Sequence, residues 1–386
     1  MRASPRSSVG ATEGGWRRRL LLLAGAAIVL AVAVPYGLSS LAQEPSSAER
    51  FTLAPQQRVF FVGNTFAERL AIGGYFEAVL HAAHPGHELV VRNLGWSADE
   101  VDLQPRPANF GTMLEHLDWN DADVVFLCFG MNESFGGDAG LVGWRERLST
   151  YLDSLVGQTF HREPVQLVLV SPIAHEDLGA PLPTGPQVVE RNRLLGLYSD
   201  VMRDVAAEKK IRFIDLFTPT HAFTTSQSEV QLTLNGIHLT ETGDYHVSRW
   251  MAESLGWVKA AEADAAMARA KVNPDAPSEQ LRSAIIERNH HFLLLWRPLS
   301  SFYIWGGRAY CWKADEPMVE LERIAMMVEN RDRVVWERSE IDPTDVWRAA
   351  PGENARWEAP IDYSDRTDPA VTPPQLEMVR RNGVIK

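Results

Sequence analysis

The chain has 386 residues, of which 45% are hydrophobic and 23% charged, and its formal net charge is -12. These values are typical of a globular protein and allow one large domain or two smaller ones. A nucleic-acid partner is not expected, because no run rich in Lys or Arg lies outside the N-terminus. We also expect no metal and no cofactor, since no CxxC or HExxH motif occurs. Cys128 lies in an apolar run and is expected to be a buried core residue.

The N-terminus has the pattern of a secretory signal peptide. Arg17, Arg18 and Arg19 precede an apolar run at residues 20–34, and small residues follow up to Ala42. We expect residues 1–42 to be a signal peptide cleaved after Ala42, and the protein to be exported to the periplasm or the outside. The alternative is an uncleaved membrane anchor, although the run is shorter than the roughly 20 residues that a spanning helix needs.

Between residues 50 and 257, apolar runs typical of strands alternate with helical patterns. Strands are expected at residues 59–63, 88–95, 123–130, 165–173 and 211–217, and helices at residues 65–83, 141–157, 188–210 and 240–256. Near-continuous apolar strands that alternate with helices predict a three-layer α/β/α domain with a parallel sheet. In such sheets, ligands bind beyond the carboxyl ends of the strands. The residues that follow each strand are therefore the candidate site.

The rest of the chain is predicted to be an extension of this domain. Residues 258–275 are rich in Ala and acidic residues and suggest a helical connector, and residues 276–349 suggest a mostly helical or irregular extension. Six of the twelve Trp lie between residue 276 and the end, and we expect them to pack against the neighbouring domain rather than to bind sugars. Residues 350–386 suggest an irregular tail. The extension either braces the α/β domain or recruits other exported proteins.

The first strand ends in Gly63, Asn64 and Thr65, where a helical pattern begins. A hydroxyl at the positive end of a helix is well placed for chemistry that passes through an alkoxide or an oxyanion. The alternative is that Thr65 is only the N-cap of its helix.

Later strands end in further polar groups. The second strand is followed by Asn93, Gly95, Ser97, Ala98 and Asp99, and the third by Gly130, Asn132 and Glu133. An Asn amide or a loop N–H can donate to a developing oxyanion. The fourth strand leads to His175, Glu176 and Asp177, which suit catalysis, substrate binding or a solvated loop. A final loop, Asn235-Gly236-Ile237-His238, places a potential general base before the last helix.

These four blocks resemble the SGNH or GDSL-type esterase/lipase (acylhydrolase) superfamily over about residues 56–257. The family's Gly-Asp-Ser-Leu, Gly-bearing loop, Gly-x-Asn-Asp and Asp-x-x-His motifs correspond to residues 63–66, 93–99, 130–133 and 235–238. The resemblance implies a flavodoxin-like fold. The segments "GNTFAER" and "SPIAHEDLG" also resemble exported proteins of planctomycete-type bacteria.

The resemblance implies a catalytic role for several residues, and it also shows where this chain differs from the family motifs. Thr65 takes the place of the nucleophilic Ser, His238 is the base, and Asn235 replaces the Asp that orients it. The Ala98 N–H and the Asn132 amide would be the oxyanion donors. Asn64 replaces the family's Asp before the nucleophile, and Glu133 replaces the Asp of the third motif. An Asn at the orienting position can reduce turnover by about 10⁴-fold, and the methyl of Thr restricts its side chain.

Three hypotheses follow. The first is an exported hydrolase that deacylates polysaccharides or small-molecule esters with Thr65 and His238. The second is a weakened or inactive relative that binds a glycan or acylated ligand. The third is a hydrolase with a relocated acid or base, for which the candidates are Glu68, Asp99, Glu133, His175, Glu176 and Asp177.

Overall fold

Five short strands form one parallel sheet in the computed structural model, which describes residues 50–226, 229–298, 304 and 316–352. The strands are β1 (Arg58–Gly63), β2 (Val90–Asn93), β3 (Val124–Cys128), β4 (Gln166–Val170) and β5 (Arg212–Ile214). Their order is β2-β1-β3-β4-β5, and every neighbouring pair is parallel. This is the flavodoxin-like order, so the predicted fold class is confirmed.

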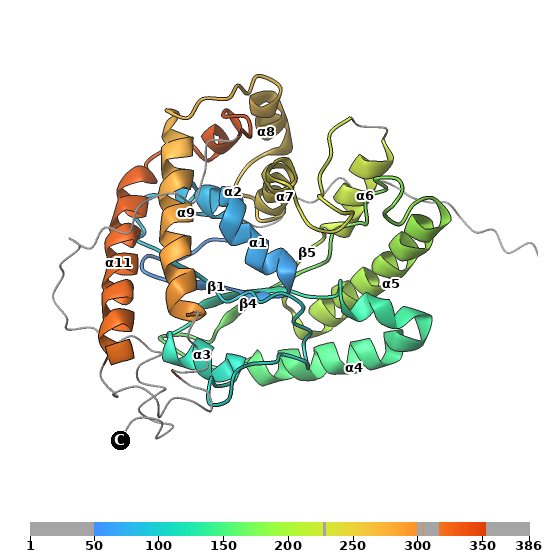
Figure 1. The fold of residues 1–386 in the computed structure, drawn as a ribbon, viewed down its shortest axis with the longest axis horizontal. Helices are drawn as coiled ribbons and strands as arrows, with labels where there is room; N and C mark the ends of the chain where they lie inside the picture. The colour runs from blue at the N-terminus through green and yellow to red at the C-terminus, as the bar shows by residue number, and fades with distance from the viewer. Residues whose placement is uncertain (1–49, 227–228, 299–303, 305–315, 353–386) are drawn as a thin grey trace, which may run out of the picture. The chain divides into compact units, whose positions relative to one another are not determined.

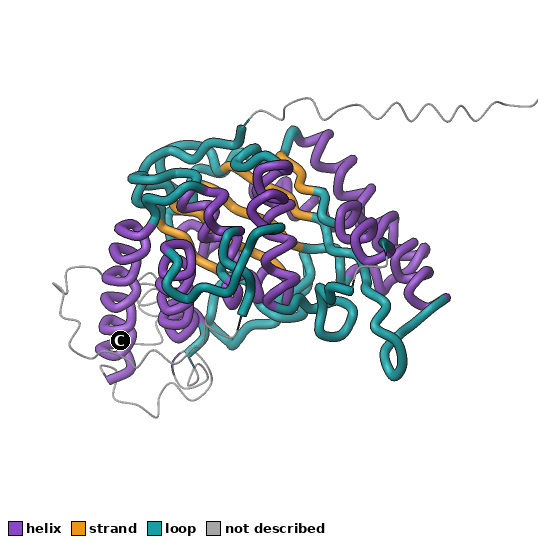
Figure 2. The backbone as a smooth tube through the Cα atoms, turned by 90° about the horizontal axis from the view of Figure 1, so that it is seen from above, coloured by secondary structure: helices purple, strands orange, loops and turns teal. Residues whose placement is uncertain are grey.

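Helices cover both faces of the sheet (Figures 1 and 2). Val59 and Phe61 of β1 join one buried cluster, and Phe60 and Val62 join the other, as alternation along a strand requires. The first face carries α1 (Thr65–Gly73), α2 (Tyr75–Ala82) and α7 (Glu241–Ser254), and the second carries α3 (Met113–Trp119), α4 (Gly137–Leu155) and α5 (Pro186–Lys209).

Two helical predictions need correction. Residues 65–83 form two helices rather than one, because Gly74 adopts a left-handed conformation with φ of 72° that ends α1. Phe217, expected at the end of the last strand, instead begins α6 (Phe217–Thr225). The Ser171 hydroxyl accepts the backbone N–H of Phe217 at 3.1 Å and so fixes the start of that helix.

The described residues after 257 belong to the same compact unit as the sheet. The predicted connector is helical only in α8 (Ala260–Met267), and the described part of the extension contains α9 (Pro277–Trp296), α11 (Glu316–Arg338) and a short 3₁₀ segment, η3 (Pro343–Trp347). Trp296 and Trp347 are fully buried, in line with the packing expectation.

Helices α9 and α11 lie side by side (Figure 1). Each donates a side-chain hydrogen bond to the backbone in or next to β2, an edge strand of the sheet. Trp336 Nε1 donates to the Leu89 carbonyl at 2.8 Å, and Arg288 donates to the Val91 carbonyl. These bonds satisfy backbone groups that an open edge would present to other chains. The extension therefore covers the edge of the sheet.

Two predicted segments lie mainly outside the described residues. The expected signal peptide, residues 1–42, is wholly outside them, and of the expected tail only residues 350–352 are described. Among the helices that the structure describes, none combines the length and the apolar character needed to span a bilayer.

Candidate active site

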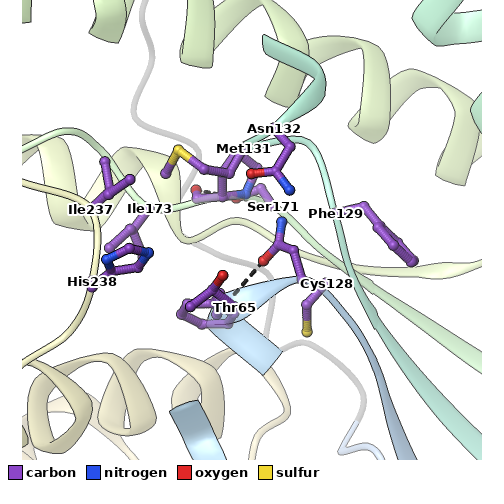
Figure 3. A pocket seen from close by; sticks show the side chains of 12 residues that line it. Thr65, Cys128, Phe129, Met131, Asn132, Ser171, Ile173, Ile237 and His238 are labelled. Atoms are coloured by element: carbon purple, nitrogen blue, oxygen red, sulfur yellow. Dashed lines mark hydrogen bonds between the residues drawn. The ribbon is translucent and has the colours of Figure 1, made fainter. Parts of the chain in front are cut away.

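A small cavity opens at the carboxyl ends of β1, β3 and β4, where the sheet order predicts a ligand site. Thr65, Asn132 and His238 all line it, with the Thr65 hydroxyl turned toward the space between the other two side chains (Figure 3). Its volume is about 30 Å³, which is enough to admit a water molecule. The remaining lining residues are mostly apolar: Phe66, Cys128, Phe129, Met131, Pro172, Ile173 and Ile237, beside Asn64 and Ser171.

Thr65 occupies the first helical position of α1, but it is not the helix cap. Asn64 is the N-cap, and its Oδ1 accepts the Phe66 N–H at 3.0 Å, so the alternative that Thr65 caps the helix is wrong. The turn depends on Gly63, because a Cβ there would lie 2.1 Å from the Cys128 carbonyl oxygen. No hydrogen bond joins the Thr65 hydroxyl to any other residue that the structure describes. The hydroxyl is thus available to a ligand.

Asn235 holds His238 through two hydrogen bonds. Its Oδ1 accepts the His238 backbone N–H at 3.1 Å, and its Nδ2 lies 3.0 Å from His238 Nδ1. The backbone donor fixes which end of the amide is oxygen, so the amide nitrogen must donate to Nδ1. A neutral imidazole in this arrangement carries its proton on Nε2. That is the opposite tautomer from the one a general base for Thr65 needs.

The surroundings of His238 also disfavour its charged form. Burial lowers the pKa of His238 below its ordinary value, and the Arg69 guanidinium lowers it further. Arg69 donates to the Leu239 carbonyl through Nη2 at 2.7 Å, which holds this cation beside the histidine loop. His238 is therefore neutral at neutral pH, as a base must be, but no carboxylate of the described residues pairs with it to stabilise the imidazolium.

The two candidate oxyanion donors differ in position. Asn132 lines the cavity and uses one amide hydrogen on the Asp99 carbonyl at 3.2 Å, which leaves the other for a ligand. Ala98 is exposed and is not a lining residue, and its N–H meets no acceptor within the described part of the chain. Its φ is 68°, a left-handed value that costs a non-glycine residue about 1–2 kcal/mol. The position at which the family has Gly thus keeps the backbone shape of Gly.

Glu133 lies beside the site without entering it. It is buried, and its carboxylate accepts the N–H groups of Gly130 at 2.8 Å and Val101 at 3.2 Å. Burial raises the pKa of Glu133 to about 7. The carboxylate ties the loop after β3 to the loop after β2, which is a structural role.

His175, Glu176 and Asp177 follow β4, and the first two contact the loop that carries His238 on the side away from the cavity. Glu176 accepts the N–H groups of Leu232 at 3.0 Å and Thr233 at 2.7 Å, and the His175 ring packs against Gly236, where a Cβ would lie 2.4 Å from its Nε2. Asp177 accepts the Gly185 N–H at 2.7 Å in an exposed turn. None of the three acidic or imidazole side chains lines the cavity.

Sequence reasoning missed Ser171 and Ile173, which line the cavity directly after β4. The signal was available, because both follow the strand more closely than the titratable residues that drew attention to this segment. Ser171 is occupied structurally, since its hydroxyl accepts the Leu216 N–H at 2.8 Å. Within the described ranges, no group of three or more His, Cys, Asp or Glu is arranged to hold a metal ion.

The order of the strands, the helix that begins at Thr65 and the loop of His238 before α7 form the arrangement that the resemblance to SGNH-type hydrolases predicts. Residues 62–244, slightly less than half of the chain, match the model of the GDSL-like lipase/acylhydrolase family, and this segment is of the SGNH/GDSL type, an esterase and acylhydrolase class. The predicted recognition is confirmed. The residues of α9 and α11 lie outside the matched segment.

Several solved structures are similar at low identity. A gut microbial diltiazem-metabolizing enzyme is 15% identical with a TM-score of 0.42, and the match covers 54% of this chain but only 49% of that one. An alpha/beta hydrolase from the metagenome of Lake Arreo, Spain, is 16% identical over 54% of this chain and 99% of its own, with a TM-score of 0.41.

The acetylxylan esterase Axe2 from Geobacillus stearothermophilus is 18% identical over 54% of this chain and 98% of its own, with a TM-score of 0.41. Similarities of this degree do not identify a substrate. No curated protein matches the sequence significantly.

Proposed function

We propose that this protein hydrolyses esters of short acyl groups, with Thr65 as the nucleophile and His238 as the general base. The observation that carries the proposal is that Thr65, His238 and Asn132 line one cavity at the N-terminus of α1. Nucleophile, base and oxyanion donor are the three parts that acyl transfer requires.

The size of the cavity favours a short acyl group. About 30 Å³ between apolar walls that include Met131, Ile173 and Ile237 suits an acetyl group better than a longer chain. The alcohol that carries the acyl group is either a polysaccharide or a small molecule.

The reaction would follow the order of acyl transfer. Thr65 Oγ1 attacks the ester carbonyl carbon while His238 Nε2 takes its proton, and the carbonyl oxygen becomes an oxyanion beside the Asn132 amide and the Ala98 N–H. The C–O bond to the alcohol then breaks, and the alcohol leaves with the proton from His238. Water attacks the acyl-threonine with His238 again as base, which releases the acid and restores Thr65.

The Asn235 amide makes this base weak. To free Nε2, the imidazole must carry its proton on Nδ1, so the Asn235 amide must turn and give up the bond from the His238 N–H. Losing that bond and leaving its donor unpaired costs about 1–3 kcal/mol, which corresponds to a rate lower by roughly 5- to 150-fold. We therefore expect slow turnover.

The same hydrogen bonds support a second candidate function. With Nε2 protonated, His238 is a donor rather than a base, and together with Asn132 it would present donors to a bound carbonyl oxygen. The protein would then bind an acylated ligand or a glycan without hydrolysing it. The relocated acid or base has less support, because Glu133, His175, Glu176 and Asp177 lie outside the cavity.

We also propose that the protein is exported. The support is in the sequence, where three arginines precede the apolar run at residues 20–34. Contact with the membrane would be limited to this segment if it stays uncleaved. N-terminal sequencing of the protein recovered from the periplasm or medium of an expressing bacterium tests both statements.

The decisive experiment compares hydrolysis of p-nitrophenyl acetate, butyrate and octanoate by the unmodified chain, Thr65→Ala and His238→Ala. The exposed Thr52→Ala is the matched control and should not alter the rate. Catalysis by Thr65 predicts slow turnover that is fastest with acetate and lost in both site variants. Thr65→Ser should be a few-fold faster, because it lacks the crowding methyl. No turnover with any ester, combined with binding of an acetylated sugar, would support the second candidate function.

A further inference from the structure

Arg297, the residue that ends α9, connects the extension to both sides of the candidate site. Its guanidinium forms an ion pair with the Glu68 carboxylate, one helical turn after Thr65 in α1. The same guanidinium lies over the Trp96 ring, 4.9 Å from its centre. Glu68 also accepts a hydrogen bond from the Ser97 hydroxyl. One side chain of the extension thus reaches α1 and the loop after β2.

We call the loop after β2, residues 96–99, the oxyanion loop because it carries Ala98. Arg106 of the α/β domain also contacts this loop. The Arg106 guanidinium lies over the Trp96 ring at 4.3 Å from its centre and forms a bidentate pair with Asp99, of which one contact is 2.8 Å. Two arginines therefore contact the oxyanion loop, and of these only Arg297 comes from outside the family segment. The Trp296 ring of α9 also packs on Trp96, with the ring centres 6.2 Å apart.

The oxyanion loop needs such support. Ala98 keeps a left-handed φ that a non-glycine residue avoids, and it is exposed, so its own packing does not hold it. One backbone bond lies within the loop, from the Asp99 N–H to the Trp96 carbonyl at 3.1 Å. Two bonds tie it to its neighbours: the Trp96 N–H donates to the Gly63 carbonyl at 2.9 Å, and the Asp99 carbonyl accepts from the Asn132 amide at 3.2 Å. Contacts from outside the loop must supply the rest of its order.

We propose that Arg297 is a positioning residue, through which the extension fixes the oxyanion loop that carries the Ala98 N–H. Glu68 is then an intermediate in this clamp rather than an acid or base, and its charge suits that role. Burial raises the pKa of Glu68, but the hydrogen bonds from Arg297 and Ser97 outweigh that effect and leave the pKa lowered, so the anion persists at neutral pH. The catalytic part of this inference rests on the proposed ester hydrolysis.

The experiment uses the full chain with Arg297→Gln, Arg297→Lys and the control Arg331→Gln. Arg331 pairs with Glu287 at 2.8 Å within the same extension, away from the oxyanion loop. Amide hydrogen exchange of the peptide covering residues 94–101 is the first readout, because the protected Trp96 and Asp99 amides report on the loop. The kcat and KM for p-nitrophenyl acetate are the second.

We expect Arg297→Gln to exchange about tenfold faster in this peptide and to lose about tenfold in kcat with a smaller change in KM. Arg297→Lys should recover part of both, since it keeps the charge for Glu68 but not the planar stacking. Arg331→Gln should change neither. Exchange as slow in Arg297→Gln as in the control would overturn the proposal, provided both variants melt alike. Faster exchange in a chain without esterase activity would support the clamp and refute ester hydrolysis instead.

Discussion

The cavity at Thr65 and the contact between the extension and β2 use polar groups in opposite ways. The contact contains a buried charge cluster of Glu77, Arg92, Arg288 and Asp332. Asp332 accepts from Arg92 at 2.9 Å and from Arg288 at 3.2 Å, and Arg288 also pairs with Glu77. In the cavity, by contrast, the hydroxyl of Thr65 has no partner among the described residues.

The polar groups are paired in one region and unpaired in the other because one region holds the structure together and the other receives a ligand. A charge removed from water is tolerated only when another charge or several hydrogen bonds replace the solvent, so the buried charge cluster has to be paired. A site that receives a ligand must leave donors and acceptors unpaired until the ligand arrives. Polar groups without internal partners therefore indicate function here, and paired ones indicate structure. Three changes test this contrast.

The largest effect is expected from Asp332→Ala, which removes the shared acceptor of Arg92 and Arg288. Both guanidinium groups stay buried, and one broken buried pair typically costs about 3–5 kcal/mol. We expect a loss of that size in the free energy of unfolding, measured by urea denaturation. The contact between α9, α11 and β2 should loosen with it.

The matched control for this change is Arg323→Ala on the same helix, α11. Arg323 pairs with Glu320 at 3.0 Å, but both side chains are exposed, and exposed pairs contribute about 0–1 kcal/mol. If Asp332→Ala destabilised the protein no more than Arg323→Ala, the buried charge cluster would not be what holds the extension.

The next effect is a gain of function from Asn235→Asp. A carboxylate would still accept the His238 backbone N–H, and it would accept the Nδ1 proton instead of donating to that nitrogen. The base then has the required tautomer without turning an amide, and the imidazolium gains an anionic partner. We expect kcat for p-nitrophenyl acetate to rise by at least roughly 5- to 150-fold, and at most by about 10⁴-fold. The gain must vanish when Thr65→Ala is added. A kcat that stays the same or falls would show that Asn235 is not what limits the base.

Much of the site could be predicted from the sequence, for a physical reason. Thr65 and Asn132 follow strands, and the carboxyl ends of parallel strands meet at one edge, so their proximity follows from the fold. The orientation of the Asn235 amide could not be predicted, because it depends on a backbone hydrogen bond inside a loop.

The contacts of the extension could not be predicted from the sequence either. Arg92 and Asp332 are 240 residues apart, and Arg297 and Glu68 are 229 apart. No local pattern links partners at such separations, and only the packing of α9 against β2 selects them. The end of α1 at Gly74 is an intermediate case, because the adjacent glycines Gly73 and Gly74 are a local signal for a helix end that the sequence contains.

The smallest effect concerns Asp244, which is buried like the charge cluster but forms no ion pair with any residue that the structure describes. The Arg282 guanidinium acts on it only as a nearby charge that lowers its pKa less than burial raises it. Ser248 reaches its Oδ1 at 3.3 Å, and its buried Oδ2 meets no side-chain donor within the described structure. Burial raises the pKa of Asp244 to about 7, whereas an unfolded chain gives Asp a value near 3.9. Between these values the folded protein keeps a proton that the unfolded chain has lost.

Folding therefore binds a proton between about pH 4 and pH 7. The contribution of Asp244 to the free energy of unfolding is complete below about pH 4 and is lost as the pH rises toward 7. The slope is at most about 1.4 kcal/mol per pH unit for this group, and Glu133, whose pKa is also raised to about 7, adds to it. Asp244→Asn keeps the shape of the side chain and removes its share of the slope. Urea unfolding at pH 4.5, 5.5, 6.5 and 8 should show the variant gaining on the parent as pH rises. A constant difference across these pH values would mean that Asp244 ionises in the folded protein as it does in water, and that burial without an ion pair does not decide its charge.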